Sequence, residues 1–280
     1  MAIKTENLSG YNARPSPPTT TNHTGTQMHK PIVIIGIGEM AGVFSHGFLR
    51  SGYPVYPVTR AMNLNEVANA LPEPELVLVA VGEADIEPTL ANIPSPWRQR
   101  LALLQNELLP RDWQCAALPQ PSVISVWFEK KSGQATKVLI PSPVFGQHAP
   151  LLQAALAEVD IPCYTIESDE ALRYELVRKN VYILTTNIAG LVVGGNVAEL
   201  WQQHEELARA VASDVMDIQQ HLLGQPLPRA ELIAGMLEAF EGDPEHRCMG
   251  RSAPTRLARA LTIAEGAGLT VAKLREIAAR

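Results

Sequence analysis

The chain has 280 residues, of which 46% are hydrophobic and 19% charged, and its formal net charge is −6 at pH 7. This length can bury one large core or two smaller ones. The negative charge argues against nucleic acid or an anionic membrane surface as the main partner. No apolar run approaches the roughly 20 residues of a membrane span. The three cysteines form no C-x-x-C pair, so we expect neither disulfides nor a zinc site, which fits a cytoplasmic protein.

The first 29 residues differ in composition from the rest of the chain. The stretch from Pro15 to Thr21 is rich in proline, serine and threonine and offers little to bury. It also lacks the order of charged, apolar and small residues that defines a secretory signal. We therefore expect residues 1–29 to be a disordered leader, or Met28 to be the true start.

The most informative stretch is residues 31–42, where an apolar run enters a glycine-rich turn. An unbroken apolar run is typical of a buried parallel strand. The glycines permit a tight turn and the close approach of a pyrophosphate, and the helix that follows directs its free N–H groups at the anion. The order strand, G-x-G-x-x-A turn, helix thus predicts a dinucleotide site. The turn that we assign to cofactor binding is Gly36-Ile37-Gly38-Glu39-Met40-Ala41.

The next strand, residues 53–60, points to the identity of the cofactor. Its two prolines suit an edge strand. In dinucleotide-binding units the end of this strand meets the adenosine ribose, where an acidic residue would bond the 2′-hydroxyl. Here that position holds Thr59 and Arg60. A guanidinium suits a 2′-phosphate, so we expect NADP(H) rather than NAD. The alternative is that Arg60 is an ordinary solvated surface residue.

The remaining pattern predicts an α/β domain followed by an all-α domain. Helical periods separate apolar strands as far as residue 166, which indicates a Rossmann-type parallel sheet over 30–167. Helical periodicity then dominates over 168–280. We expect strands at 76–81, 100–104, 122–128, 136–140 and 161–166, with helices at 65–70, 86–93, 150–159, 169–193, 197–223, 229–240 and 253–279.

Candidate site residues lie where strand tips should meet the helical domain, the usual place for a ligand in an open α/β sheet. Val81 ends one strand, and Gln105 and Asn106 follow another, so we assign all three to cofactor binding and Asn106 also to catalysis. Asn106 could instead cap the following turn. Lys179 and Asn180 stand among apolar neighbours, and a buried lysine has the lowered pKa that acid–base work needs. Lys179 could equally be a surface residue that reaches water.

With these residues the chain resembles the ketopantoate reductase family from Pro31 to its end. The resemblance rests on the turn at 36–41, on Arg60, on Gln105-Asn106 where the family has Gln-Asn-Gly, and on the layout Asp169, Tyr174, Asn180. It implies an NADP-binding Rossmann domain, a helical C-terminal domain resembling that of 6-phosphogluconate dehydrogenase, and reduction of a 2-oxo acid. A homodimer formed through the helical domain is a further expectation.

The chain also departs from the family pattern at sites that carry chemistry. The family's catalytic lysine falls on Leu176, so Lys179, one helical turn on, is the candidate substitute. A lysine after the third strand is replaced by Gly82 and then Glu83. Ser252 stands in the place of a glutamate.

The arginines beside Ser252 leave two interpretations open. Arg251 or Arg256 could face a substrate carboxylate, but charge on a helix surface is the interpretation slightly favoured.

Two functions are therefore compatible with these residues. The first is an NADP-dependent reductase of a small carbonyl substrate, with Lys179 as general acid and Asn106 and Asn180 as positioning groups. The second is a protein of the same fold that binds NADP, has lost catalysis and serves as a sensor or scaffold.

Overall fold

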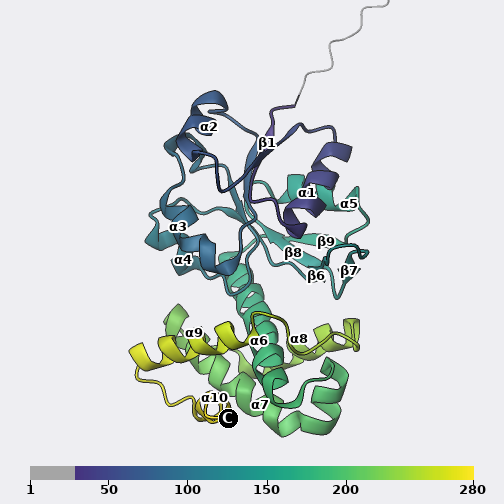
Figure 1. Cartoon of the computed structure of the whole chain (residues 1–280), viewed down its shortest axis with the longest axis vertical. Coiled ribbons are helices and arrows are strands. Elements are labelled where there is room, and N and C mark those ends of the chain that lie inside the picture. Colours follow the sequence, from purple (N-terminus) through teal and green to yellow (C-terminus); the bar gives the residue numbers. More distant parts are fainter. Residues whose placement is uncertain (1–28) are drawn as a thin grey trace, which may run out of the picture.

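The computed structural model describes residues 29–280. Residues 1–28 of the expected leader, with the suggested start at Met28, fall outside this range, and only its last residue, His29, is described. The described chain forms two lobes, with the sheet in one and helices alone in the other (Figure 1). In this part of the chain, no helix combines the length and apolar character that crossing a membrane requires.

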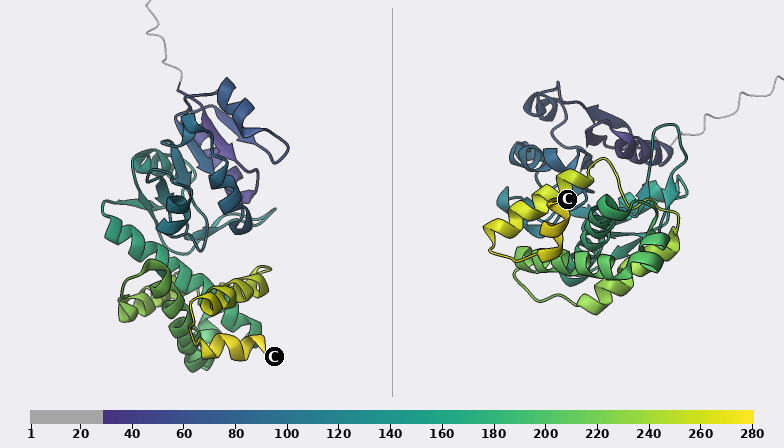
Figure 2. Two further views of the ribbon diagram at one scale, coloured as in Figure 1. Left: turned by 90° about the vertical axis from the view of Figure 1, so that its left-hand side faces the viewer. Right: turned by 60° about the horizontal axis from the view of Figure 1, so that its bottom comes forward.

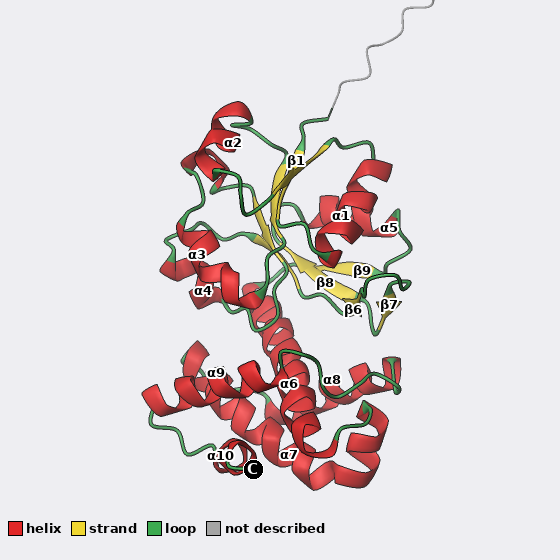
Figure 3. Cartoon of the chain, viewed as in Figure 1, coloured by secondary structure: helices red, strands yellow, loops and turns green. Residues whose placement is uncertain are grey.

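The first lobe is built on a seven-stranded sheet that is mostly parallel, as predicted (Figure 3). Its order is β2-β1-β3-β4-β5-β8-β9, and β2 lies at the edge, which suits its proline. Within this sheet β5 and β8 pair antiparallel, and the other neighbouring strands pair parallel. The strands are β1 (Ile32–Ile35), β2 (Val55–Val58), β3 (Leu76–Val79), β4 (Leu101–Leu103), β5 (Ser122–Ile124), β8 (Ser142–Phe145) and β9 (Cys163–Ile166).

The strand expected over 122–128 is wrong in its second half. β5 ends at Ile124, and the chain then leaves the sheet to form a small hairpin of β6 (Phe128–Glu129) and β7 (Lys137–Val138). The N–H of Trp127 donates to the side-chain hydroxyl of Ser142 in β8 at 2.9 Å instead of to a backbone carbonyl of that strand. The strand expected at 136–140 is present in part as β7, which pairs antiparallel with β6 outside the main sheet. The next strand of the main sheet is β8, which was not predicted.

Helices cover both faces of the sheet. Alternate residues of β1 and β3 point into two separate hydrophobic clusters, one under α1 and α5 and the other under the remaining helices of the lobe. Helix α4 was not predicted, although Pro110 at its first turn is a favoured helix start. The helices are α1 (Glu39–Arg50), α2 (Leu64–Ala70), α3 (Ile86–Ala91), α4 (Pro110–Cys115) and α5 (Ala149–Ala157), with short 3₁₀ turns η1 (Glu83–Asp85) and η2 (Ser95–Trp97).

The second lobe is helical, as predicted (Figure 2). Side chains of Ser168 and Asn196 cap the first two helices. The single helix expected over 253–279 is wrong, because the chain turns at Gly268 and at Val271, where φ is 35°. The helices are α6 (Asp169–Val193), α7 (Val197–Leu223), α8 (Arg229–Gly242), α9 (Ala253–Gly266) and α10 (Ala272–Ala278).

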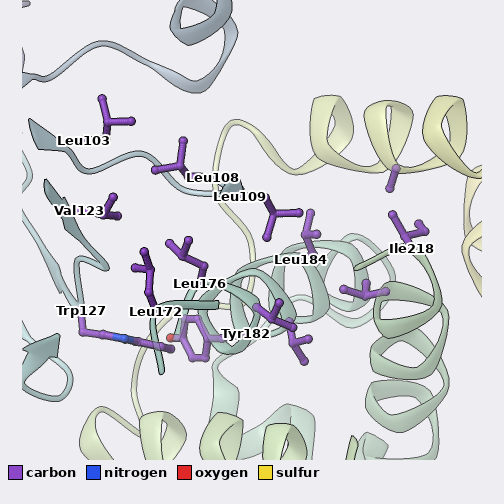
Figure 4. Close-up of a cluster of buried hydrophobic side chains, with 14 of the residues drawn as sticks. Leu103, Leu108, Leu109, Val123, Trp127, Leu172, Leu176, Tyr182, Leu184 and Ile218 are labelled. Atoms are coloured by element: carbon purple, nitrogen blue, oxygen red, sulfur yellow. The ribbon is translucent and has the colours of Figure 1, made fainter. Parts of the chain in front are cut away.

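Helix α6 joins the lobes and is buried on nearly every side through its middle. One hydrophobic cluster runs from the sheet through α6 into the helical lobe, so the two lobes share a core (Figure 4). Tyr182 of α6 packs edge-on against Trp127, with ring centroids 5.1 Å apart. Each large side chain buried in this way contributes roughly 1.5–3 kcal/mol. The shared core fixes where α6 meets the carboxyl ends of the strands.

Candidate cofactor and substrate site

A cavity of about 780 Å³ opens along the glycine-rich turn and the ends of β2 and β3. Gly36 has a φ of 104°, and a Cβ there would lie 2.5 Å from the Ala80 carbonyl oxygen, so only glycine fits. Gly38 has open space where its Cβ would be, and no side chain caps the start of α1 behind it. The Gly36 N–H donates to the Val58 carbonyl at 2.9 Å, whereas the first N–H groups of α1 have no side-chain cap and can face an anion.

Most of the residues assigned to the cofactor line this cavity. Gly36, Ile37, Gly38, Thr59, Arg60 and Val81 are all in its wall. Glu39 begins α1, and Ala41 is buried beneath the turn. Arg60 is 91% exposed, and its guanidinium donates to Asp85 Oδ2 at 2.6 Å. It therefore lies at the solvent-exposed mouth of the cavity.

A second cavity of about 350 Å³ lies between the carboxyl edge of the sheet and α6. Val81 and Gly82 belong to the walls of both cavities, so the two spaces adjoin. The structure brings five predicted residues to this second cavity: Met40, Val81, Gln105, Asn106 and Lys179.

Lys179 is the chemically most distinctive of these residues. Its side chain is only 9% exposed, and its Nζ lies 4.2 Å from the centre of the Trp127 ring and 5.4 Å from that of Tyr182. Among the residues described, no side chain or carbonyl accepts a hydrogen bond from this amine. Burial lowers the pKa of Lys179 to about 7, helped by the positive charges of Arg256 and Arg178. The interpretation as a solvated surface lysine is therefore wrong.

The other two predicted catalytic residues are placed differently. Asn106 lines the cavity, and its Nδ2 donates to Glu83 Oε1 at 3.1 Å. Asn180 is 1% exposed and lies outside the cavity wall, where its Nδ2 donates to Gln219 Oε1 at 2.9 Å. Asn180 thus ties α6 to α7. Gln105 uses its amide to hold the Val79 carbonyl at 2.7 Å.

Leu176 and Lys179 lie on the same helix, α6, but have different surroundings. Leu176 is 3% exposed and belongs to the hydrophobic cluster beneath the sheet, whereas Lys179, one turn further, lines the cavity. The position at which the family resemblance implies a lysine is therefore used here for packing.

Arg256 is the main site residue that sequence reasoning misplaced. Its side chain is 7% exposed, so the interpretation as helix-surface charge is wrong for Arg256, although Arg251 is exposed. Arg256 donates to Glu83 Oε1, to Glu107 Oε1 at 2.9 Å and to Asn187 Oδ1 at 2.8 Å. The signal was present, because Arg256 follows Ala253 by three residues and shares the buried face of α9.

His246 also lines the cavity without having been predicted there. Its Nδ1 lies 3.4 Å from Asp243 Oδ2, and Asp243 is paired with Lys137 at 2.7 Å. Burial holds the pKa of His246 below its ordinary value. The imidazole is therefore neutral at pH 7 and adds no charge to the cavity.

The arrangement of these two lobes is also found in solved structures of other proteins. No protein-family profile matches the sequence, and no curated protein sequence matches it. Solved structures do match. A ketopantoate reductase from Ralstonia eutropha aligns with a TM-score of 0.63 at 16% identity, over 89% of this chain and 96% of that one. A dimeric ketopantoate reductase from Staphylococcus aureus gives 0.62 at 13% identity, over 88% and 96%.

A D-mandelate dehydrogenase solved with NADH gives 0.61 at 16% identity, over 88% of this chain and 96% of that one. The chain therefore has the ketopantoate reductase fold along nearly its whole described length. The resemblance seen in the sequence is confirmed at the level of the fold.

Proposed function

We propose that this protein is an NADP-dependent oxidoreductase of the ketopantoate reductase type, which reduces a small 2-oxo acid or related carbonyl compound by hydride transfer. The observation that carries the proposal is the position of Lys179. An amine without a partner, with its pKa lowered to about 7, lies in a cavity that adjoins the glycine-rich cleft. A proton donor and a nucleotide cleft in contact are what carbonyl reduction needs.

The geometry of the glycine-rich turn supports binding of a dinucleotide in the cleft. Gly36 holds a backbone conformation open to glycine, and the space at Gly38 lets a pyrophosphate approach the start of α1. Arg60 would bind the 2′-phosphate of the cofactor. Val81 and Asn106 line the second cavity. When bound, the reduced nicotinamide supplies the hydride.

The chain's own residues would supply the proton and the orientation. Lys179 Nζ would donate to the carbonyl oxygen as the hydride arrives, and its aromatic neighbours exclude water from the amine. Asn106 would position the substrate from the tip of β4. Asn180, which bonds Gln219, would act as a positioning residue by fixing α6 rather than by touching substrate.

The proposal is tested by titrating NADPH and NADH by fluorescence, followed by a screen of 2-oxo acids for oxidation of the cofactor. We expect NADPH to bind more tightly than NADH, and Arg60→Ala to weaken NADPH alone by about tenfold. Lys179→Met should lower turnover at least 100-fold while leaving the NADPH affinity within about twofold. Equal binding of both cofactors, unchanged by Arg60→Ala, would refute the NADP assignment.

A second candidate function is a sensor or scaffold that binds NADP without turnover. Leu176 at the family's lysine position favours it, since the usual proton donor is absent there. Tight NADPH binding with no carbonyl turned over, and no effect of Lys179→Met, would select this function.

A homodimer through the helical region remains part of the proposal, supported by a structural neighbour described as dimeric.

A further inference from the structure

The indole ring of Trp127 lies directly against the proposed proton donor. Lys179 Nζ is over the face of this ring, 4.2 Å from its centre, and lies 5.4 Å from the centre of the Tyr182 ring. The two rings meet edge-on at an angle of 66°, next to each other in Figure 4. The amine therefore has an aromatic surface on two sides.

The backbone between β5 and β6 fixes the position of the indole. The Trp127 N–H donates to the Ser142 hydroxyl at 2.9 Å, and the Trp127 carbonyl accepts from the Leu139 N–H at 2.9 Å. Both bonds anchor Trp127 at the base of the β6–β7 hairpin, and the residue is 0% exposed. The ring face is thus in place beside α6 before any substrate binds.

The charged residues around Lys179 act mainly against protonation of its amine. Burial lowers the pKa of Lys179 most, and the positive charges of Arg256 on α9 and Arg178 on α6 lower it further. Glu129 of β6 raises this pKa, but its carboxylate is also paired with Lys131. Ion pairing thus gives the charged amine little support.

The other titratable groups of the cavity wall offer the amine no free negative partner. His246 and Tyr182 are uncharged at pH 7, because burial holds the pKa of the imidazole below its ordinary value and that of the phenol above it. Glu83 pairs with Arg256, and Lys130 adds another positive charge to the wall. Within residues 29–280, no group accepts a hydrogen bond from Lys179 Nζ. The aromatic faces are therefore the contacts that favour its charged form.

A tryptophan face is the strongest aromatic partner for a cation, and the attraction grows where water is excluded. The guanidinium of Arg178 also faces Trp127, with its Cζ 5.3 Å from the ring centre. Arg178 has carboxylate partners of its own in Glu175 and Glu238, so it does not depend on the ring. Lys179 has no such alternative.

We propose that Trp127 is a positioning residue for carbonyl reduction, which keeps the Lys179 amine charged and in place through a cation–π contact. Trp127 lies outside the cavity wall, so it would act through the lysine and not touch the substrate. Tyr182 lines the cavity and adds a second, more distant face. This inference rests on the proposed function and deepens it by adding a residue to the same site.

The test weakens the ring face of Trp127 while keeping its packing. Site-specific replacement of Trp127 by mono-, di- and trifluorotryptophan withdraws electron density from the face step by step and changes its shape little. A smaller residue would be less informative, because water entering the space beside the amine would raise the pKa of Lys179. The same series at Trp113 is the matched control, since this ring is buried and no cation of the described chain lies over it.

Two titrations follow the charge of the amine. Trace labelling with acetic anhydride, quantified by mass spectrometry, reports the neutral fraction of Lys179 at each pH without substrate or cofactor. The rate of NADPH oxidation by a carbonyl compound gives the pH midpoint of reduction.

We expect both midpoints to move to lower pH as fluorine is added to Trp127, by about 0.5–1 pH unit with three fluorines. The rate at pH 5.5 should stay within about twofold, because the amine is still charged there. The Trp113 series should leave both midpoints in place.

A role in packing alone would change stability, or the rate at every pH, and would not move either midpoint. Midpoints that stay in place throughout the Trp127 series, in protein of unchanged fold, would overturn the proposal, as would a movement to higher pH. If no carbonyl compound is reduced, the proposed function fails. The labelling titration alone then decides whether Trp127 stabilises the charged amine.

Discussion

Lys179 keeps its amine beside aromatic rings instead of in water, and this arrangement costs the folded protein free energy. Its pKa falls from 10.5 to about 7, chiefly through burial. Between these values the unfolded chain holds more protons than the folded one, so the free energy of unfolding rises with pH across this window. Below about pH 7 both states hold the proton and the full penalty applies. A site that destabilises its own fold is typical of a functional group.

Replacement of Lys179 by methionine should therefore stabilise the protein while it removes activity. We expect Lys179→Met to raise the free energy of unfolding by about 1–3 kcal/mol at pH 7, because methionine fills the same space without a charge to desolvate. The gain should shrink as pH approaches 10.5. Urea unfolding at several pH values measures it. Lys131→Met, at a side chain 55% exposed, is the control with no expected gain. A less stable Lys179→Met at pH 7 would contradict the account.

The same lysine should set the pH dependence of reduction. The proton donor must be charged, so turnover in the direction of carbonyl reduction should fall as pH rises through about 7. Oxidation of the alcohol needs the neutral amine and should rise over the same range. Rates measured in both directions from pH 5.5 to 9 test this. A reduction rate that stays flat to pH 9 would show that another group donates the proton.

At the scale of elements, close contact between α1 and α5 depends on one glycine. A Cβ added to Gly47 would lie 2.1 Å from the Ala155 carbonyl oxygen. Gly42, on the same helix, is exposed and has nothing within 4 Å of the position that a Cβ would take. The two positions therefore separate packing from helix propensity within one element.

Alanine at these two glycines should have opposite effects. Gly47→Ala must push α5 away from α1 and should cost about 2–4 kcal/mol of stability. Gly42→Ala should gain about 0.5–1 kcal/mol, since alanine favours the helix. Thermal and urea unfolding of both variants would check this. Similar stabilities for the two would mean that the helices are not in contact at Gly47.

The elements also show which parts of the fold can be predicted from sequence. The strand, turn and helix over residues 31–50 were predictable because their signals are local: an apolar run, a required glycine and a helix start. The break after Ile124 was not, because it depends on the Ser142 hydroxyl capturing the Trp127 N–H. The turn at Val271 could not be predicted either, because a valine and not a glycine has the positive φ there.

The candidate site likewise contains residues that can be predicted from the sequence and residues that cannot. Asn106 follows a strand tip and Lys179 interrupts an apolar stretch, so each stands out within its own segment. Arg256 and its partners do not, because Glu83 lies 173 residues away and Glu107 149 residues away along the chain. Only the tertiary structure shows that an arginine on the buried face of α9 meets carboxylates at two strand ends.

At the scale of the whole molecule, α6 is not the only link between the lobes. Glu107, just after Asn106 at the end of β4, accepts from both Arg256 and Arg259 of α9. Its backbone has a φ of 64°, a left-handed conformation that is unfavourable for any residue with a Cβ. The two arginines therefore hold a strained turn of the sheet lobe against the helical lobe, next to the candidate site.

Two variants of Glu107 separate the ion pairs from the strain. Glu107→Ala removes the carboxylate and keeps the strained φ, and should cost about 2–3 kcal/mol because buried Arg256 loses a partner. Glu107→Gly removes the same carboxylate but tolerates the conformation, and should be about 1 kcal/mol more stable than Glu107→Ala. Both should lower kcat/KM about tenfold with little change in NADPH affinity, because the turn that carries Asn106 is no longer held.

Glu205→Ala supplies the control for these variants, since its carboxylate pairs with Arg209 on the exposed surface of α7. It should change stability by less than about 0.5 kcal/mol. Urea unfolding gives the stabilities, and steady-state kinetics give the activity. If Glu107→Ala were as stable and active as the unmodified protein, the contacts of α9 with the sheet lobe would have no part in holding the two lobes together. The position of Asn106 would then depend on the shared hydrophobic core around α6 alone.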